Sequence, residues 1–237
     1  MAAFSGAQTI LGFALSAPAI AGLTSLAAGI SIWFSRKPAI VRELKSRFYA
    51  PSAHSVAAFA VDAPAAIGFA LLFASVTYFI PPLPGRPIAA AFFFFALAVA
   101  VLAGFFAALA HALVALAPSQ DLAQLGGGLC ISLCFLFGGL FLPQPQIPAG
   151  WMGLYYAVPT SHVARAVATS QTFCAGAGCP TIAVPGATVS VSDYIQLYLG
   201  LQTRQQFLFA ELGWAAMAIA AVLAVALLRA QLPMHAL

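Results

Sequence analysis

Long apolar segments, separated by short polar ones, are the main feature of this chain. Five of them are long enough to cross a lipid bilayer as a helix, which needs about 20 residues. They cover Thr9–Phe34, Ser55–Ile80, Ile88–Leu116, Leu122–Leu142 and Phe207–Leu228. Each segment is continuously apolar, whereas the strands of a membrane barrel alternate apolar and polar residues over about ten positions. The pattern predicts an all-α integral membrane protein.

Composition supports the membrane assignment and changes how the net charge is interpreted. Hydrophobic residues make up 63% of the 237 residues and charged residues 6%, with a mean hydropathy of +1.01. Soluble domains carry about 25% charged residues, so this composition indicates a membrane protein. At about 20 residues for each span, residues 1–237 are expected to form a single membrane domain. The net charge of +4 does not indicate a nucleic-acid partner, because the basic residues cluster beside an apolar segment and not among aromatic residues that could stack on bases.

The loop at 35–54 indicates the direction in which the chain crosses the membrane. Five of the nine Lys and Arg residues lie between Arg36 and Arg47, and basic residues favour the cytoplasmic side. This loop is therefore predicted to be cytoplasmic, as is Ala117–Asp121. The turn at Pro81–Pro87 and the long loop at 143–206 are then external.

Charged and apolar residues alternate at roughly helical spacing from Val41 to Tyr49. The spacing predicts a short interfacial helix with Arg42, Lys45 and Arg47 facing water. Such a helix could anchor the chain on anionic lipid headgroups, at about 1 kcal/mol for each basic residue near the surface. Such a helix could also dock a partner protein. From the residues alone, the anchor on lipid headgroups is favoured.

Isolated ionisable residues within or beside the apolar segments are candidates for function. Asp62 has two interpretations. It is either a proton-relay group or a helix N-cap with Pro64 in the first turn, and the cap is favoured. His111, Asp121 and Glu211 lie singly near predicted span ends, where each is expected to reach headgroups or water without pairing.

The four cysteines form two pairs with different expectations. Cys130 and Cys134 lie four apart in a predicted span without a nearby His or carboxylate, so packing is favoured over metal binding. Cys174 and Cys179 lie in the external loop within FCAGAGCP. Oxidation is possible on that side of the membrane, and a disulfide between them is favoured.

Two further features concern interfaces and catalysis. Trp151, Tyr155 and Tyr156 follow the proline-rich turn PQPQIP and predict an aromatic belt at the outer interface. The glycines Gly126–Gly128 lie in an apolar segment and lack the Lys of the phosphate-binding motif GxxxxGK[ST]. HExxH and GxSxG motifs are also absent from the sequence. We expect no catalytic residue, no metal site and no cofactor in this chain.

Four ordered matches to one transporter family run from Arg36 to Phe207, and three of them are segments with a recognisable order of residues. RKPAIVRELKSRFYAPSAHSVAAFAVDAP at Arg36–Pro64 resembles the YRE…YSP…EIP segment of G-type ATP-binding-cassette (ABC) exporters. FLFGGLFLPQPQIPAGWMGLYYAVPTSHVARAVATSQT at Phe135–Thr172 resembles the family's LFSGF…P.P.IP.WW.W.Y…SQ block. VPGATVSVSDYIQLYLGLQTRQQF resembles the TV.EYL…FG segment before the last span. The chain is thus similar to the C-terminal part of a pleiotropic-drug-resistance-type membrane domain, a type-2 ABC exporter permease.

The resemblance implies roles for residues of the first segment. The matching segment of the family is a coupling helix that receives motion from the nucleotide-binding domain, which makes Arg42, Glu43 and Tyr49 the expected contacts. Asp62 and Pro64 match the family's Glu-x-Pro elbow at the membrane. This chain departs from the family at Arg36, because the family usually begins the motif with Glu-Arg.

The later segments imply further roles. Leu140 and Phe141 fall where the family has an apolar plug between the central cavity and the exit, an external gate. External loops of the family commonly contain a disulfide, which again favours Cys174–Cys179. The family domain has six spans, and the match begins at the second, so the first span and the ATPase domain are expected outside this sequence.

The resulting hypothesis is a multi-pass permease that exports hydrophobic or amphipathic substrates such as lipids, sterols or drugs. Its expected partners are a nucleotide-binding domain or half-transporter that binds ATP and Mg²⁺, a second membrane domain in a homo- or heterodimer, and the bilayer of the plasma membrane or another eukaryotic membrane.

Two alternatives remain from the sequence. A truncated, non-transporting scaffold or regulator that pairs with full-length transporters is favoured by the missing elements and by Arg36. A secondary transporter would show inverted repeats and buried ionisable residues, and neither is evident in the sequence.

Overall fold

The computed structural model describes most of the predicted membrane domain. It describes residues 2–46, 51–79, 88–138, 142, 144–172, 181–184 and 187–190, and the single positions Asp193, Gly213, Trp214, Ala216 and Ile219. The predicted fifth span at Phe207–Leu228 therefore lies almost entirely outside the described residues.

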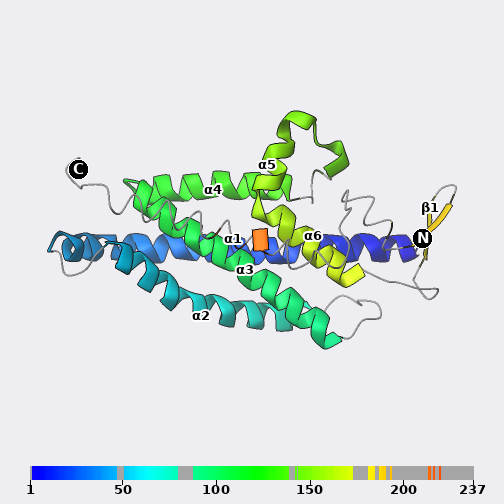
Figure 1. The fold of residues 1–237 in the computed structure, drawn as a ribbon, viewed down its shortest axis with the longest axis horizontal. Coiled ribbons are helices and arrows are strands. Elements are labelled where there is room, and N and C mark those ends of the chain that lie inside the picture. The colour runs from blue at the N-terminus through cyan, green and yellow to red at the C-terminus, as the bar shows by residue number, and fades with distance from the viewer. Residues whose placement is uncertain are drawn as a thin grey trace.

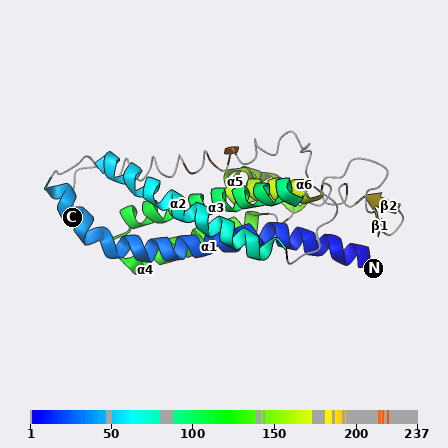
Figure 2. The ribbon, with the colours of Figure 1, turned by 90° about the horizontal axis from the view of Figure 1, so that it is seen from below.

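Four long helices run alternately in opposite directions and form an elongated bundle (Figures 1 and 2). They are α1 (Ala2–Lys45), α2 (Pro51–Thr77), α3 (Ile88–Leu116) and α4 (Gln120–Phe137). Within the described part of the chain, these four helices are long and apolar enough to cross a membrane. The prediction of an all-α integral membrane protein is confirmed, and four of the predicted spans correspond to helices.

Helix α1 is longer than the predicted span and includes the basic segment. Its 44 residues extend about 66 Å at 1.5 Å per residue, whereas the hydrocarbon core of a bilayer is about 30 Å thick. The separate short helix predicted from Val41 is therefore wrong, because α1 continues through to Lys45. Arg, Lys, Ala, Glu and Leu are strong helix formers, and the helix continues through Pro38, which lacks one backbone hydrogen bond.

Helix α3 lies at the centre of the bundle and packs against α1, α2, α4 and a shorter helix, α6 (Pro159–Thr172). Alanines on α3 let the neighbouring helices approach closely, and Phe95, Leu102 and Phe106 fill the remaining space, each at most 2% exposed. Helix association within a membrane depends mainly on such packing, because lipid tails are as apolar as the side chains. The α1–α3 contact is therefore a main source of the domain's stability.

Glycines of α1 permit this close contact. A Cβ atom added at Gly29 would lie 2.8 Å from Cβ of Ala110 on α3, so the two helices would have to move apart. We expect Gly29→Ala to lower the free energy of unfolding by about 1–3 kcal/mol, the usual range for overpacking. The matched control is Gly68→Ala on α2, where an added Cβ meets nothing within 4 Å. The free energy of unfolding of both variants is measured by titration with sodium dodecyl sulfate, with circular dichroism as the signal. Equal effects would contradict this packing.

Short helices follow α4 where an external loop was predicted. They are η1 (Gln144–Gln146), η2 (Ala149–Trp151), α5 (Met152–Ala157) and α6, followed by the antiparallel strands β1 (Thr181–Val184) and β2 (Ala187–Ser190). Helix α6 is polar in sequence yet lies against α1, α3 and α4. Two of its buried hydroxyl groups donate to carbonyl oxygens: Thr160 Oγ1 to Cys134 O at 2.8 Å, and Ser161 Oγ to Tyr155 O at 2.7 Å. The buried hydroxyl group of Thr169 has no such partner among the described residues. The bonds of Thr160 and Ser161 allow a polar helix to be buried.

Candidate functional site

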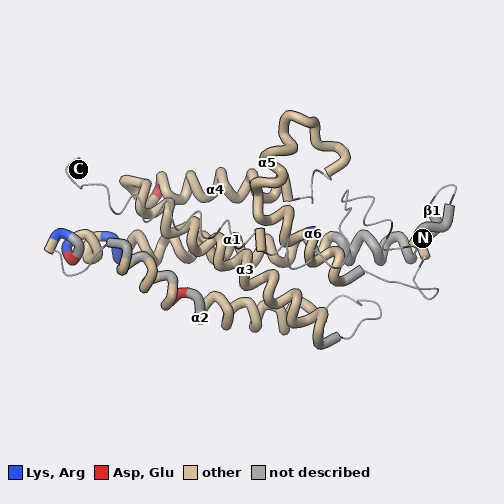
Figure 3. The backbone as a smooth tube through the Cα atoms, in the orientation of Figure 1, with Lys and Arg blue, Asp and Glu red and all other residues tan. Residues whose placement is uncertain are grey.

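Five of the charged residues that the structure describes lie on the last part of α1, at one end of the bundle (Figure 3). Because the helices alternate in direction, this end also holds the start of α2, the end of α3 and the start of α4 with Asp121. Arg36, Arg42, Glu43 and Lys45 are exposed on α1. We call Arg36–Lys45 the basic extension of α1.

Lys37 ties the basic extension to the end of α3. Its Nζ donates hydrogen bonds to the backbone oxygens of Val114 at 2.8 Å and Ala117 at 2.7 Å. The last carbonyl groups of a helix have no partner within the helix, and the negative end of the helix dipole attracts a cation. Lys37 therefore satisfies two carbonyl groups at the C-terminal end of α3 and holds α1 beside it.

A second set of contacts lies one helical turn before Lys37. Trp33 Nε1 donates to Asp62 Oδ2 at 3.1 Å, and His111 Nε2 lies 2.9 Å from the same oxygen. The rings of Trp33 and His111 are 4.1 Å apart between centroids. Since these residues come from α1, α2 and α3, one carboxylate oxygen joins three helices. We call Trp33, Asp62 and His111 the three-helix node.

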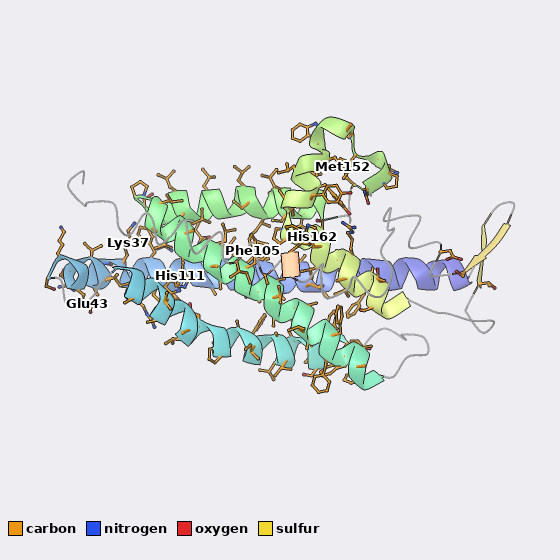
Figure 4. The ribbon with its side chains drawn as sticks, viewed as in Figure 1. Lys37, Glu43, Phe105, His111, Met152 and His162 are labelled. Carbon is orange, nitrogen blue, oxygen red and sulfur yellow. The ribbon has the colours of Figure 1, made fainter. Side chains whose placement is uncertain are left out.

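Two further side chains, those of His54 and Arg36, contact the Trp33 ring of the node. The ring of His54, near the start of α2, meets the edge of Trp33 at 6.4 Å between centroids. The guanidinium carbon of Arg36 lies 5.6 Å from the Trp33 ring centroid, a cation–π distance. Figure 4 places His111 and Lys37 toward the same end of the bundle, with Glu43 farther out along α1.

The node corrects two predictions from the sequence. Asp62 is not an N-cap, because α2 begins at Pro51 and both Asp62 and Pro64 lie inside the helix. His111 does not lie singly at a span end, because it pairs with Asp62. One signal could have revealed this pairing: Trp33, Asp62 and His111 lie near the same end of three consecutive antiparallel spans, and hence at similar depth.

The other predicted site residues are distributed as follows. Arg42 and Glu43 are exposed near the end of α1, away from the node along the helix. The elbow role of Asp62 and Pro64 stays a prediction. Tyr49, the gate residues Leu140 and Phe141, and the cysteines Cys174 and Cys179 lie outside the described residues.

At the opposite end of the bundle, the aromatic residues differ from one another. Trp151 is 57% exposed and Tyr156 is 47% exposed, as an aromatic belt requires. Tyr155 is only 1% exposed and belongs to the hydrophobic core. The belt predicted from three residues therefore contains at most two of them.

Comparison with known proteins shows the family to which this sequence belongs. The profile of the family described as "ABC-2 type transporter" matches residues 2–172, which cover α1 to α6. The chain belongs to the ABC-2 type transporter family. This ABC-2 chain is thus an integral membrane protein and the membrane part of an ABC transporter.

The curated relatives are ABC transporters of the G family. ABC transporter G family member 41 of Oryza sativa subsp. japonica is 28% identical over 197 residues, which are 83% of this chain and 13% of the relative. Member 45 of the same organism is 27% identical over 166 residues, 70% of this chain and 12% of the relative. Member 36 of Arabidopsis thaliana is 26% identical over 146 residues, 62% of this chain and 10% of the relative. The chain spans 10–13% of the length of these relatives.

Proposed function

We propose that this ABC-2 chain is the permease part of a G-type exporter that moves hydrophobic or amphipathic compounds across a membrane. ATP hydrolysis on a nucleotide-binding domain outside residues 1–237 drives the process, with ATP and Mg²⁺ bound there. The observation that carries the proposal is the exposed basic extension of α1 with Arg42 and Glu43, in a chain of the ABC-2 type transporter family.

The position of the extension supports a role in coupling. It lies at the end of the bundle where α2 and α4 begin and α3 ends, so a partner bound there touches the ends of several spans at once. An anchor on lipid headgroups would need only exposed charge. The hydrogen bonds from Lys37 to the end of α3 give the extension a fixed attachment, which transmission of force requires.

The pockets of the described bundle bear on where the substrate binds. The cavity between α1, α3, α4 and α6, lined in part by Pro18, Leu102 and Thr160, has a volume of about 10 Å³. Sites for small molecules usually measure about 300–1,000 Å³. A lipid, sterol or drug therefore does not fit in this cavity. A larger and more open pocket of about 360 Å³, away from the α1–α3 contact, is lined by Tyr156, His162, Arg165 and Trp214. We place the substrate between two membrane domains of a homo- or heterodimer, as an expectation from the family and not from the volume of either pocket.

The test of the proposed function is purification followed by a transport assay. The tagged native product is purified in mild detergent and the co-purified proteins are identified by mass spectrometry. The complex is then placed in vesicles and supplied with ATP and Mg²⁺. We expect ATP-dependent movement of fluorescent phospholipids, sterols or amphipathic dyes, and inhibition by vanadate. Recovery of the chain without an ATPase domain, either in the same polypeptide or bound to it, would instead favour a non-transporting scaffold or regulator.

A further inference from the structure

The three-helix node lies at the base of the basic extension, on the same side of α1 as Lys37. Trp33 and Lys37 are four residues apart in the helix, and residues at that spacing lie on one face. Trp33 contacts Asp62 of α2 and His111 of α3, and Lys37 contacts the end of α3. Two successive turns of α1 are therefore attached to its neighbours.

Immediately beyond these attachments α1 has a weak point. Pro38 lies inside the helix and lacks the N–H group that would bond to the carbonyl of Phe34, so a helix bends most easily there. Beyond Pro38, the side chains of Arg42, Glu43 and Lys45 are exposed. The contacts of Trp33 and Lys37 hold the part of α1 that precedes Pro38 against α2 and α3, so a force that reaches this part acts on three helices at once.

The chemistry of the node suits a firm attachment. Nε2 of His111 and Nε1 of Trp33 both lie at hydrogen-bond distance from a single oxygen of Asp62, at 2.9 Å and 3.1 Å. The side chain of His111 is only 12% exposed and that of Asp62 is 33% exposed, and hydrogen bonds to a charged group are stronger than neutral ones. An ionisable residue within a span is costly to keep, which indicates a function for it.

We propose that Asp62 is a positioning residue: by binding Trp33 and His111 it holds the base of the basic extension, so that α1, α2 and α3 move together when the extension is displaced. This inference rests on the proposed function in one respect: the nucleotide-binding domain is what displaces the extension. Arg42 and Glu43 are the expected surface on which a partner acts, and Asp62 acts through Trp33 and His111 without touching the partner.

Hydrogen–deuterium exchange on the native complex in nanodiscs tests the attachment itself. In Asp62→Leu, a leucine side chain of similar size replaces the carboxylate. Leucine is stable in a membrane but accepts no hydrogen bond. The variant removes the acceptor that Trp33 and His111 share. We expect amide exchange at residues 38–46 to become about tenfold faster, the scale of a net hydrogen-bond contribution, and exchange in α4 to stay unchanged. Asp62→Glu restores the acceptor and is expected to restore slow exchange. Asp121→Leu, at the same end on α4, is the matched control and leaves residues 38–46 unchanged.

Two outcomes overturn the inference. The first is unchanged exchange at residues 38–46 in Asp62→Leu, and the second is a rate increased equally by Asp121→Leu. If Asp62→Leu is not recovered from membranes, Trp33→Phe makes the same test, because it removes one N–H group and keeps an aromatic ring. Faster exchange at residues 38–46 is again expected, and no change again overturns the inference.

A second measurement separates this inference from the proposed function. In the purified complex, we expect Asp62→Leu to raise the ATP hydrolysed per substrate molecule moved by several-fold, and Asp62→Glu to bring that ratio back. If no ATPase accompanies the chain, the proposed function fails, but the exchange experiment still decides whether Asp62 holds the extension.

Discussion

Replacing Glu43 with Ala is expected to reduce ATP-driven export on the order of tenfold, the scale of a typical coupling free energy between two sites. Glu43 is exposed near the end of α1, next to Arg42, and lies farther out than the node. If Glu43 has the proposed coupling role, removing its charge weakens a contact with the nucleotide-binding domain, and the buried core is unchanged because Glu43 is exposed. ATP hydrolysis is then expected to lose its dependence on substrate while the protein remains folded.

The measurement compares substrate-stimulated ATPase activity and vesicle export in the same preparation. Asp121→Ala is the control, because Asp121 is also an exposed carboxylate at this end but lies on α4. We expect it to retain both activities. Unchanged export and unchanged stimulation in Glu43→Ala would exclude the coupling role of this part of α1.

Replacing Phe106 with Ala is expected to have the largest effect on stability, a loss of about 3–5 kcal/mol, the usual range for removing a buried aromatic side chain. Phe106 is 2% exposed on α3 and belongs to the core cluster. A Cβ atom added at Gly22 of α1 would collide with its ring, so Phe106 lies directly at the α1–α3 contact. The substitution leaves a cavity there that the rigid backbones of two helices cannot close.

The control for Phe106→Ala lies on the same helix. Phe93 is 64% exposed, so Phe93→Ala removes the same atoms from the surface of α3. We expect it to change the free energy of unfolding by less than about 1 kcal/mol, as surface substitutions do. Titration with sodium dodecyl sulfate measures both variants. Similar losses would show that the α1–α3 contact does not dominate the stability of the bundle.

The sequence predicted the long helices well because the membrane requires them to be apolar. Val56–Thr77 and Ala90–Leu116 closely match the predicted second and third spans. The end of α1 was predicted less well. Apolar character ends before Arg36, but helical hydrogen bonding does not depend on hydrophobicity, and the helix continues to Lys45.

Helix α6 was missed for the opposite reason. Its sequence is polar, and polarity near proline residues is typical of a loop. In the structure Ser161 and Ser170 donate to nearby backbone carbonyl oxygens, those of Tyr155 and Val167, so these residues are buried without losing hydrogen bonds. A pattern of polar and apolar residues does not show where a hydroxyl group finds its acceptor.

The candidate site could be predicted only in part. The basic extension was visible as a cluster of charge in the sequence, and family resemblance gave its expected role. The node was not predicted, because Trp33, Asp62 and His111 are separated by 29 and 49 residues. Such a contact depends on how three helices are placed side by side, which single-residue properties do not determine.

A crosslinking experiment at the end of the basic extension tests its proposed coupling role. A photoreactive amino acid replaces Glu43 in the native protein, crosslinks are formed in intact membranes, and the products are identified by mass spectrometry. If Glu43 lies at the coupling surface, we expect a crosslink to a nucleotide-binding domain with a GxxxxGK[ST] motif, within the same polypeptide or in a partner. Crosslinks to lipid alone would contradict the coupling role and assign the basic extension to the membrane surface.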